Sequence, residues 1–287
     1  MANCIRCGRQ LPPFKFRKVC QWCVQHEAAQ RGEDGDDVKQ RVMPAPWVRR
    51  GESTITLTQV LFGINVAVYL AMALASGSVV DFPGETAVRF GANFGPYTLS
   101  GEWWRLVTYA FLHGGILHIA FNMWCLWDLG ALAESLYGRW TYAAIYFITG
   151  IGGGLGSIIW NPRAFTVGAS GAIFGLAGAL IASFYLGEFS LPRAAIGGTL
   201  RSLVVFAGFN LFFGGMFGGI DNACHLGGLV SGLGLGAVIA KIAPAPEHAH
   251  RRVVLLLVSV GVLAACAVAL AHHYDLPLRL GRSPFEH

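Results

Sequence analysis

Residues 224–236 read CHLGGLVSGLGLG, and this stretch decides the architecture of the chain. Gly228, Gly232 and Gly236 recur every four residues in an otherwise apolar segment, so on a helix they lie along one side. Small residues on one side of an apolar helix let a second helix approach closely, which is how helices associate in lipid. The stretch therefore predicts a membrane-embedded helix packed tightly against a partner.

A second glycine-rich stretch, residues 168–175, reads GASGAIFG and predicts the partner helix. Gly171 and Gly175 offer a surface similar to the first glycine stripe. Ser170 and His225 each stand near the start of their own segment. Docking of the two glycine surfaces would bring these two side chains within hydrogen-bond reach.

Composition indicates that a lipid bilayer surrounds most of the chain. Of its 287 residues, 54% are hydrophobic and only 13% are charged, against roughly 25% charged residues in soluble domains. The net charge of +5 is small for this length. It falls mostly at the N-terminus and in short loops, which is typical of a membrane topology signal and not of nucleic-acid binding. We expect the lipid bilayer, and no nucleic acid, as a partner.

Seven apolar runs follow the polar N-terminal region, each close to the roughly 20 residues that cross the hydrocarbon core. We expect membrane-spanning helices near residues 57–76, 113–135, 140–160, 170–187, 199–218, 224–243 and 253–271. The long segment 77–112 separates the first two and contains Trp103 and Trp104, whose rings fit a membrane interface. The predicted fold class is an all-α polytopic membrane protein.

Basic residues predict the orientation of these helices. With a cytoplasmic N-terminus, the inner loops hold Arg49, Arg50, Arg139, Arg193, Arg201, Lys241, Arg251 and Arg252, and the outer loops hold Arg89, Arg105 and Arg163. This bias favours a cytoplasmic N-terminus and an outer C-terminal tail, and we expect a multi-pass protein of the bacterial inner membrane.

His118, Ser170 and His225 then all lie at helix starts near the outer side. Because polar groups in lipid are costly and usually face the bundle interior, they indicate one outward-opening site.

Ser170 and His225 are residue types that nucleophilic catalysis requires. A helix start supplies backbone N–H donors for an anion that develops on a substrate carbonyl. A serine needs a base, which His225 would supply before it returns the proton to the leaving amine. Phe174, one turn below Ser170, is placed to pack on the imidazole. Asp221 is near in sequence, but we expect a Ser–His dyad without it.

Each of these features also has a structural explanation. A serine in a membrane helix more often forms an interhelical hydrogen bond, and glycine stripes alone indicate only packed helices. A lone intramembrane histidine is structural as often as functional. His118 and Asn122, one helical turn apart, would either donate hydrogen bonds to an oxyanion or form a polar packing network. Two observations together favour the catalytic interpretation: Ser170 and His225 lie at a similar depth, and their two segments carry matching glycine surfaces.

At these residues the sequence resembles the rhomboid family of intramembrane serine proteases, over roughly residues 56–241. The resemblance implies a six-helix core in which Ser170, in a Gly-x-Ser-Gly motif, is the nucleophile. His225, in a His-x-x-Gly-x-x-x-Gly motif, would be the base. His118 and Asn122 match the family's His-x-x-x-Asn motif, which implies an oxyanion hole completed by the backbone N–H of Ser170.

Other residues extend the resemblance. The pair Trp104-Arg105 matches a signature of the first loop, and Glu134 matches a glutamate after the second helix, where we expect it and Arg139 to hold structure. Cys224 stands where alanine is common, and the seventh span is an addition to the six-helix core. We expect three further residues to support the site: Gly168, Phe174 and Gly228.

The function implied is a serine endopeptidase that cleaves transmembrane helices near the membrane surface and needs no cofactor for catalysis. A polar cavity would admit water, and the loop from Gly214 to Asn222 would cap it. The alternative is a catalytically inactive rhomboid-like protein that binds transmembrane clients. A small-solute transporter fits less well, because its polar residues would lie near helix centres.

The N-terminal region carries a separate pattern, Cys4-x2-Cys7 and Cys20-x2-Cys23, with 12 residues between the pairs. This spacing is typical of four thiolates around one Zn²⁺, and disulfides are disfavoured in the cytosol. The region also lacks the apolar stretch of a secretory signal peptide. We expect a cytoplasmic zinc-ribbon-like module at 1–30, a linker at 31–54, the protease core at 55–243, and an additional transmembrane helix with a tail at 244–287.

Overall fold

The computed structural model describes Cys4, Cys7 and Cys23 of the N-terminal region, and residues 55–187, 193–216, 220–242 and 249–274. The chain separates into two compact units, Met1–Ser53 and Thr54–His287. The helices from α3 to α12 all belong to the second unit. Within its described ranges the regular structure of this unit is helical, apart from one isolated bridge between the backbones of Asn93 and Thr166.

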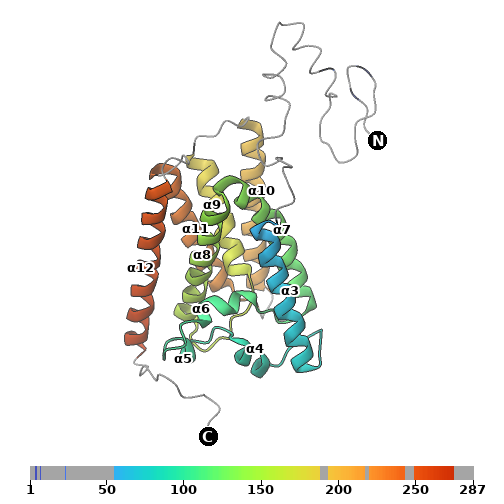
Figure 1. Ribbon diagram of the computed structural model, residues 1–287, viewed down its shortest axis with the longest axis vertical. Helices are drawn as coiled ribbons and strands as arrows, with labels where there is room; N and C mark the ends of the chain where they lie inside the picture. The colour runs from blue at the N-terminus through green and yellow to red at the C-terminus, as the bar shows by residue number, and fades with distance from the viewer. Residues whose placement is uncertain are drawn as a thin grey trace. The chain divides into compact units, whose positions relative to one another are not determined.

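Long apolar helices dominate this unit (Figure 1). Among the described residues, six are long and apolar enough to cross a membrane: α3 (Leu57–Ser76), α7 (Ile116–Tyr137), α8 (Arg139–Trp160), α10 (Arg193–Met216), α11 (Asn222–Ile242) and α12 (Ala249–His273). A further apolar helix, α9 (Ser170–Leu186), has only 17 residues. The predicted all-α polytopic fold is confirmed, and the chain is an integral multi-pass membrane protein.

Three helix starts differ by three or more residues from the predicted intervals, those of α7, α10 and α12, and α12 begins at Ala249 and not near 253. α7 begins at Ile116 and not near 113, because the backbone of Gly115 is extended, so His113 lies in the preceding loop. α10 begins at Arg193, before the apolar run that we expected from 199. Hydropathy marks the part of a helix that lies in lipid, and a helix continues beyond it wherever its polar residues reach water.

Short helices fill the long connection between α3 and α7: α4 (Gly84–Phe90), α5 (Gly95–Thr98), α6 (Arg105–Thr108) and the 3-10 helix η2 (Tyr109–Phe111). They lie at the end of the bundle where α7, α9 and α11 begin (Figure 1). The buried Arg105 guanidinium holds this connection together, since it donates to the carbonyl oxygens of Val88 and Ala92 and pairs with Glu102 at 2.7 Å.

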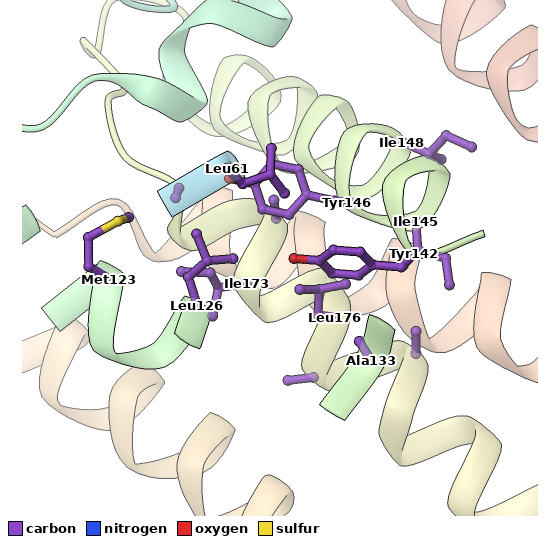
Figure 2. Close-up of a cluster of buried hydrophobic side chains, with 14 of the residues drawn as sticks. Leu61, Met123, Leu126, Ala133, Tyr142, Ile145, Tyr146, Ile148, Ile173 and Leu176 are labelled. Carbon is purple, nitrogen blue, oxygen red and sulfur yellow. The ribbon is translucent and has the colours of Figure 1, made fainter. Parts of the chain in front are cut away.

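Most side chains of the main apolar core come from α3, α7, α8 and α9, with smaller contributions from α10 and α11. Figure 2 shows Leu61 of α3, three residues of α7, four of α8 and two of α9 gathered in one cluster: Met123, Leu126, Ala133, Tyr142, Ile145, Tyr146, Ile148, Ile173 and Leu176. The largest fully buried side chains of this cluster are Tyr142 and Tyr146. This cluster fixes α9, which carries Ser170, against three other helices.

The contact between α9 and α11 is made by backbone atoms. α9 packs more extensively on α11 than on any other described helix. A Cβ atom added to any of the three predicted stripe glycines of α11 would overlap a carbonyl oxygen of α9: Gly228 faces Gly171, Gly232 faces Gly175, and Gly236 faces Ala179. Only glycine allows this approach at these positions.

Glu134 holds the start of α3. Its carboxylate accepts hydrogen bonds from the backbone N–H groups of Leu57 and Thr58, at 2.8 and 2.9 Å, and from the Thr58 hydroxyl at 2.8 Å. A negative charge at a helix N-terminus is favourable, because it satisfies N–H groups that have no intrahelical partner. The side chain of Arg139 lies 3.8 Å from the same carboxylate.

The additional helix α12 packs on the outside of the bundle. Ala267 and Ala271 are buried in a small cluster with Leu155 and Ile158 of α8. Most of its other apolar side chains are exposed, as expected for a helix that faces lipid.

Candidate active site

Ser170 and His225 meet at the starts of α9 and α11. α9 begins at Ser170 itself, and His225 lies in the first turn of α11. The Ser170 Oγ atom is 2.8 Å from the His225 Nε2 atom. The imidazole is 8% exposed, so the pair is largely shielded from bulk solvent. A hydroxyl on a neutral imidazole at this distance is the arrangement of a nucleophile and its general base.

Phe174 fixes the plane of the imidazole. Its ring stacks on that of His225, with centroids 4.4 Å apart and planes inclined by 8°. Phe174 is itself 3% exposed and lies one turn after Ser170 on α9. One helix therefore supplies both the hydroxyl at the edge of the imidazole and the ring that covers its face.

The other ring nitrogen of His225 has no acidic partner. Among the described residues, His225 Nδ1 makes no hydrogen bond. The carboxylate of Asp221 binds instead to Ser157, Thr166 and the backbone of Cys224. The arrangement is a pair of residues and not a triad.

Gly168 shapes the turn before Ser170. Its φ angle is +122°, a conformation that L side chains rarely adopt, and its N–H donates to the carbonyl of Tyr109 at 3.0 Å. A Cβ atom at this position would come within 2.7 Å of the Nε2 atom of His118. The N-cap position of α9 is Ala169, whose side chain occupies none of the first N–H groups of the helix.

His118 reaches the turn before Ser170 from α7, and Asn122 lies one helical turn later on the same helix. The Nδ1 atom of His118 accepts from the N–H of Gly114 at 3.3 Å, which places the ring proton of a neutral imidazole on Nε2, the atom beside Gly168. Asn122 donates one amide hydrogen to the carbonyl of His118 at 2.9 Å and keeps a second. Both side chains retain a donor for an anion.

His113, in the loop before α7, supports His118. It is fully buried, and the two rings meet edge to face with centroids 5.1 Å apart. Burial, with a smaller contribution from His118, lowers the pKa of His113 to about 3. A neutral ring therefore packs against His118 at physiological pH.

Sequence reasoning missed Tyr109 as part of the site. Its hydroxyl donates to the carbonyl of Gly150 at 2.6 Å and lies 3.5 Å from the sulfur of Cys224. A Cβ atom at Gly171 would lie 2.8 Å from this hydroxyl, and one at Gly153 would lie 3.2 Å from it. The only signal in the sequence was the position of Tyr109 in the aromatic-rich connection 77–112. Those aromatic residues indicated a membrane interface, and nothing indicated that Tyr109 joins α8 to α11.

The N-terminal cysteines that the structure describes are close together. The sulfur atoms of Cys4, Cys7 and Cys23 lie within 4.8 Å of one another, and those of Cys4 and Cys23 are 3.9 Å apart. Tetrahedral zinc with Zn–S bonds of about 2.3 Å needs sulfur atoms about 3.8 Å apart, which is close to the separation of Cys4 and Cys23. The predicted fourth ligand, Cys20, lies outside the described residues.

Comparisons with known proteins agree on one family. The Rhomboid domain model matches residues 100–242. Rhomboid protease AarA of Providencia stuartii is 33% identical over 204 residues, which cover 63% of this chain and 71% of that protein. The chain belongs to the rhomboid family. Rhomboid protease GluP of Bacillus subtilis (strain 168) is 34% identical over 210 residues, or 72% of this chain and 40% of GluP. The chloroplastic RHOMBOID-like protein 9 of Arabidopsis thaliana is 32% identical over 179 residues, or 61% of this chain and 40% of that protein.

The residues that match the family can be compared with the helices of the structure. Of the long helices, α7, α8, α9, α10 and α11 lie within the residues that match the Rhomboid domain, whereas α3 precedes them and α12 follows them. The rhomboid match ends at residue 242, the last residue of α11. The chain spans less than half the length of GluP and 71% of AarA.

Proposed function

We propose that this rhomboid protein is an intramembrane serine endopeptidase with Ser170 as nucleophile and His225 as base. The observation that carries the proposal is the 2.8 Å contact between Ser170 Oγ and His225 Nε2, with Phe174 stacked on the imidazole. Two relatives that match over most of this chain are named rhomboid proteases, which supports the same activity.

In this mechanism His225 Nε2 takes the proton of Ser170 as Oγ attacks the substrate carbonyl, and then passes it to the leaving amine. Water, activated by the same nitrogen, then releases the acyl group from Ser170. Negative charge on the former carbonyl oxygen would face the first backbone N–H of α9, the Nε2–H of His118 and the remaining amide hydrogen of Asn122. Loss of one such donor typically lowers kcat by about 10²–10³.

The short length of α9 supports a site below the membrane surface. Its 17 residues measure about 25 Å, against roughly 30 Å for the hydrocarbon core. If its inner end lies at the inner boundary, Ser170 lies about 5 Å below the outer one. The substrate would be a transmembrane helix that unwinds close to the surface. Part of the loop that we expect to cap the site, residues 217–219, lies outside the described residues.

The basic residues support an orientation with the N-terminus in the cytoplasm and the site opening to the outer side of a bacterial inner membrane. In this orientation the seventh helix leaves the C-terminal tail outside. Alkaline phosphatase fused after His287 should then be active in cells, because the enzyme folds only outside the cytoplasm. An inactive but well expressed fusion would contradict this orientation.

The test of the proposed activity is cleavage of a reporter transmembrane substrate in liposomes. Ser170→Ala and His225→Ala should each abolish cleavage, while Ser183→Ala, near the other end of α9, should cleave at close to the wild-type rate. A fluorophosphonate or isocoumarin should label wild-type protein on Ser170. A folded wild-type protein that is neither labelled nor active would favour the alternative, a rhomboid-like binder of transmembrane clients.

We also propose a structural zinc ion on Cys4, Cys7, Cys20 and Cys23, supported by the close approach of the three described sulfur atoms. Zinc would supply no catalytic step and would stabilise a module too small to fold alone. Purified protein should contain about one zinc per chain, and Cys4→Ser with Cys7→Ser should remove it. Exposed Cys266→Ser, in α12, is the matched control. A full zinc content in the double variant would contradict the proposal.

A further inference from the structure

The Asp221 carboxylate joins three segments of the chain. One oxygen, Oδ2, accepts hydrogen bonds from the Ser157 hydroxyl at 2.5 Å and from the Thr166 hydroxyl at 2.8 Å. The other, Oδ1, accepts from the backbone N–H of Cys224 at 2.9 Å. All three donors therefore point at a single side chain.

Two of these segments lead directly to the proposed catalytic residues. Thr166 lies in the connection between α8 and α9, four residues before Ser170. Cys224 immediately precedes His225, whose own N–H donates to the backbone carbonyl of Asp221 at 3.2 Å. Ser157 anchors the group to α8, which packs against both α9 and α11. One carboxylate thus ties the nucleophile's segment to the start of the base's helix.

The connection at Thr166 is fixed on its other side as well. Its backbone exchanges two hydrogen bonds with Asn93, at 3.1 and 2.9 Å, and the Asn93 side chain donates to the carbonyl of Gly154 at 3.0 Å. The hydroxyls of Ser157 and Thr166 are 2.6 Å apart. Both residues are 2% exposed, so a lost partner cannot be replaced readily by bulk water.

We propose that Asp221 is a positioning residue that holds Ser170 and His225 in register through Thr166, Ser157 and the start of α11. This inference rests on the proposed protease activity. Asp221 touches neither the substrate nor the imidazole Nδ1; it acts through the two segments that carry the pair. A carboxylate suits this role because charge-assisted hydrogen bonds are short and strong, and because aspartate is a favoured helix cap.

Two substitutions at Thr166 test the hydroxyl separately from the packing. Thr166→Val keeps the shape and removes the hydrogen bond to Asp221, whereas Thr166→Ser keeps the hydroxyl and removes a methyl group. We expect Thr166→Val to lower kcat for the reporter by about 10-fold to 100-fold with KM within about twofold of wild type, since misplacement by about 1 Å costs up to about 100-fold. Thr166→Ser should restore most of kcat.

The control is Ser183→Ala, which removes a buried hydroxyl that bonds to Tyr137 at the other end of α9. It should lower the melting temperature about as much as Thr166→Val and leave kcat unchanged. Asp221→Ala should slow fluorophosphonate labelling of Ser170 more than Thr166→Val does. If Asp221→Ala does not fold, the two Thr166 variants decide alone.

The inference is overturned if Thr166→Val cleaves as fast as Ser183→Ala, or if Thr166→Ser loses as much kcat as Thr166→Val, because packing would then explain the loss. Wild-type protein that is neither active nor labelled would overturn the proposed protease activity, and the positioning role with it. Active wild type with active Thr166→Val overturns the positioning role alone.

Discussion

The imidazole of His225 is held at one face and one edge. Phe174 covers the face, and Ser170 binds the Nε2 edge. Nδ1 has no hydrogen-bond partner in the described part of the chain. A ring with so few constraints can rotate about its side-chain bonds if the stacking partner is removed, so in the proposed mechanism Phe174 would contribute through geometry.

We therefore predict that Phe174→Ala lowers kcat by about 10-fold to 100-fold, because an imidazole displaced by about 1 Å no longer accepts the proton from Ser170 efficiently. Phe174→Tyr keeps the stacked ring and should retain most of the activity. Cleavage of the reporter in liposomes, measured as kcat and KM, checks both variants.

The control for lost packing is Phe184→Ala, since Phe184 is buried near the other end of the same helix. Each truncation should cost about 3–5 kcal/mol of stability, but only Phe174→Ala should lower kcat at temperatures where both proteins are folded. Equal losses of kcat would show that the effect of Phe174 is general destabilisation.

At the scale of single residues, local motifs predicted which side chains form the candidate site. They did not predict which side chains hold those residues in place. Ser170, His225 and Phe174 follow from spacing within two short stretches. Asp221 meets Thr166 and Ser157 across 55 and 64 residues of sequence. No local pattern encodes which hydroxyls a carboxylate will meet after such a long connection, so only the folded chain reveals this group.

The pair of helices α9 and α11 is the element on which the site depends. The predicted stripe of α11 faces carbonyl oxygens of α9 at each turn. We predict that Gly232→Ala forces the helices apart, because its Cβ would overlap the carbonyl of Gly175. The melting temperature in detergent should fall, and labelling of Ser170 should slow at least tenfold, as expected for misplacement by about 1 Å.

Gly234 offers a matched control on the same helix. A Cβ atom there would meet nothing within 4 Å, so Gly234→Ala should keep the wild-type melting temperature and labelling rate. Should both alanines prove equally harmless, the close backbone contact would not be needed for the site.

The sequence did not predict which helices the glycines of α8 would face. Residues 150–156 of α8 read GIGGGLG, where two overlapping four-residue spacings, Gly150 with Gly154 and Gly152 with Gly156, do not single out one packing face. In the structure these glycines admit neighbours from different directions: Gly152 and Gly156 face α11, whereas Gly154 faces Leu106 and Tyr109. Because several partners approach this one short stretch, the spacing of its glycines does not mark a single packing face.

For the whole molecule, the seven-helix order was predictable because hydropathy alone reveals spans of about 20 apolar residues. The structure adds that α12 packs on α8 through a small cluster that contains neither Ser170 nor His225. We predict that truncation after Ile242, which removes α12, leaves kcat within about twofold and lowers the melting temperature. Reporter cleavage and thermal unfolding of the truncated protein check this prediction. The same truncation carrying Ser170→Ala gives the rate of cleavage that does not depend on Ser170. Loss of activity in a folded truncated protein would assign α12 a catalytic role.

The backbone contact between α9 and α11 has a consequence for how the protein responds to its membrane. Carbonyl oxygens and Cα atoms have no rotamers, so the separation of these helices takes one value, whereas side-chain contacts would permit several. Thinner or thicker bilayers change helix tilt, and they would tilt α9 and α11 together. Labelling rates of Ser170 in lipids of different chain length would then be nearly equal. Membrane thickness would select which substrates unwind at the right depth, while the nucleophile and base keep the same spacing.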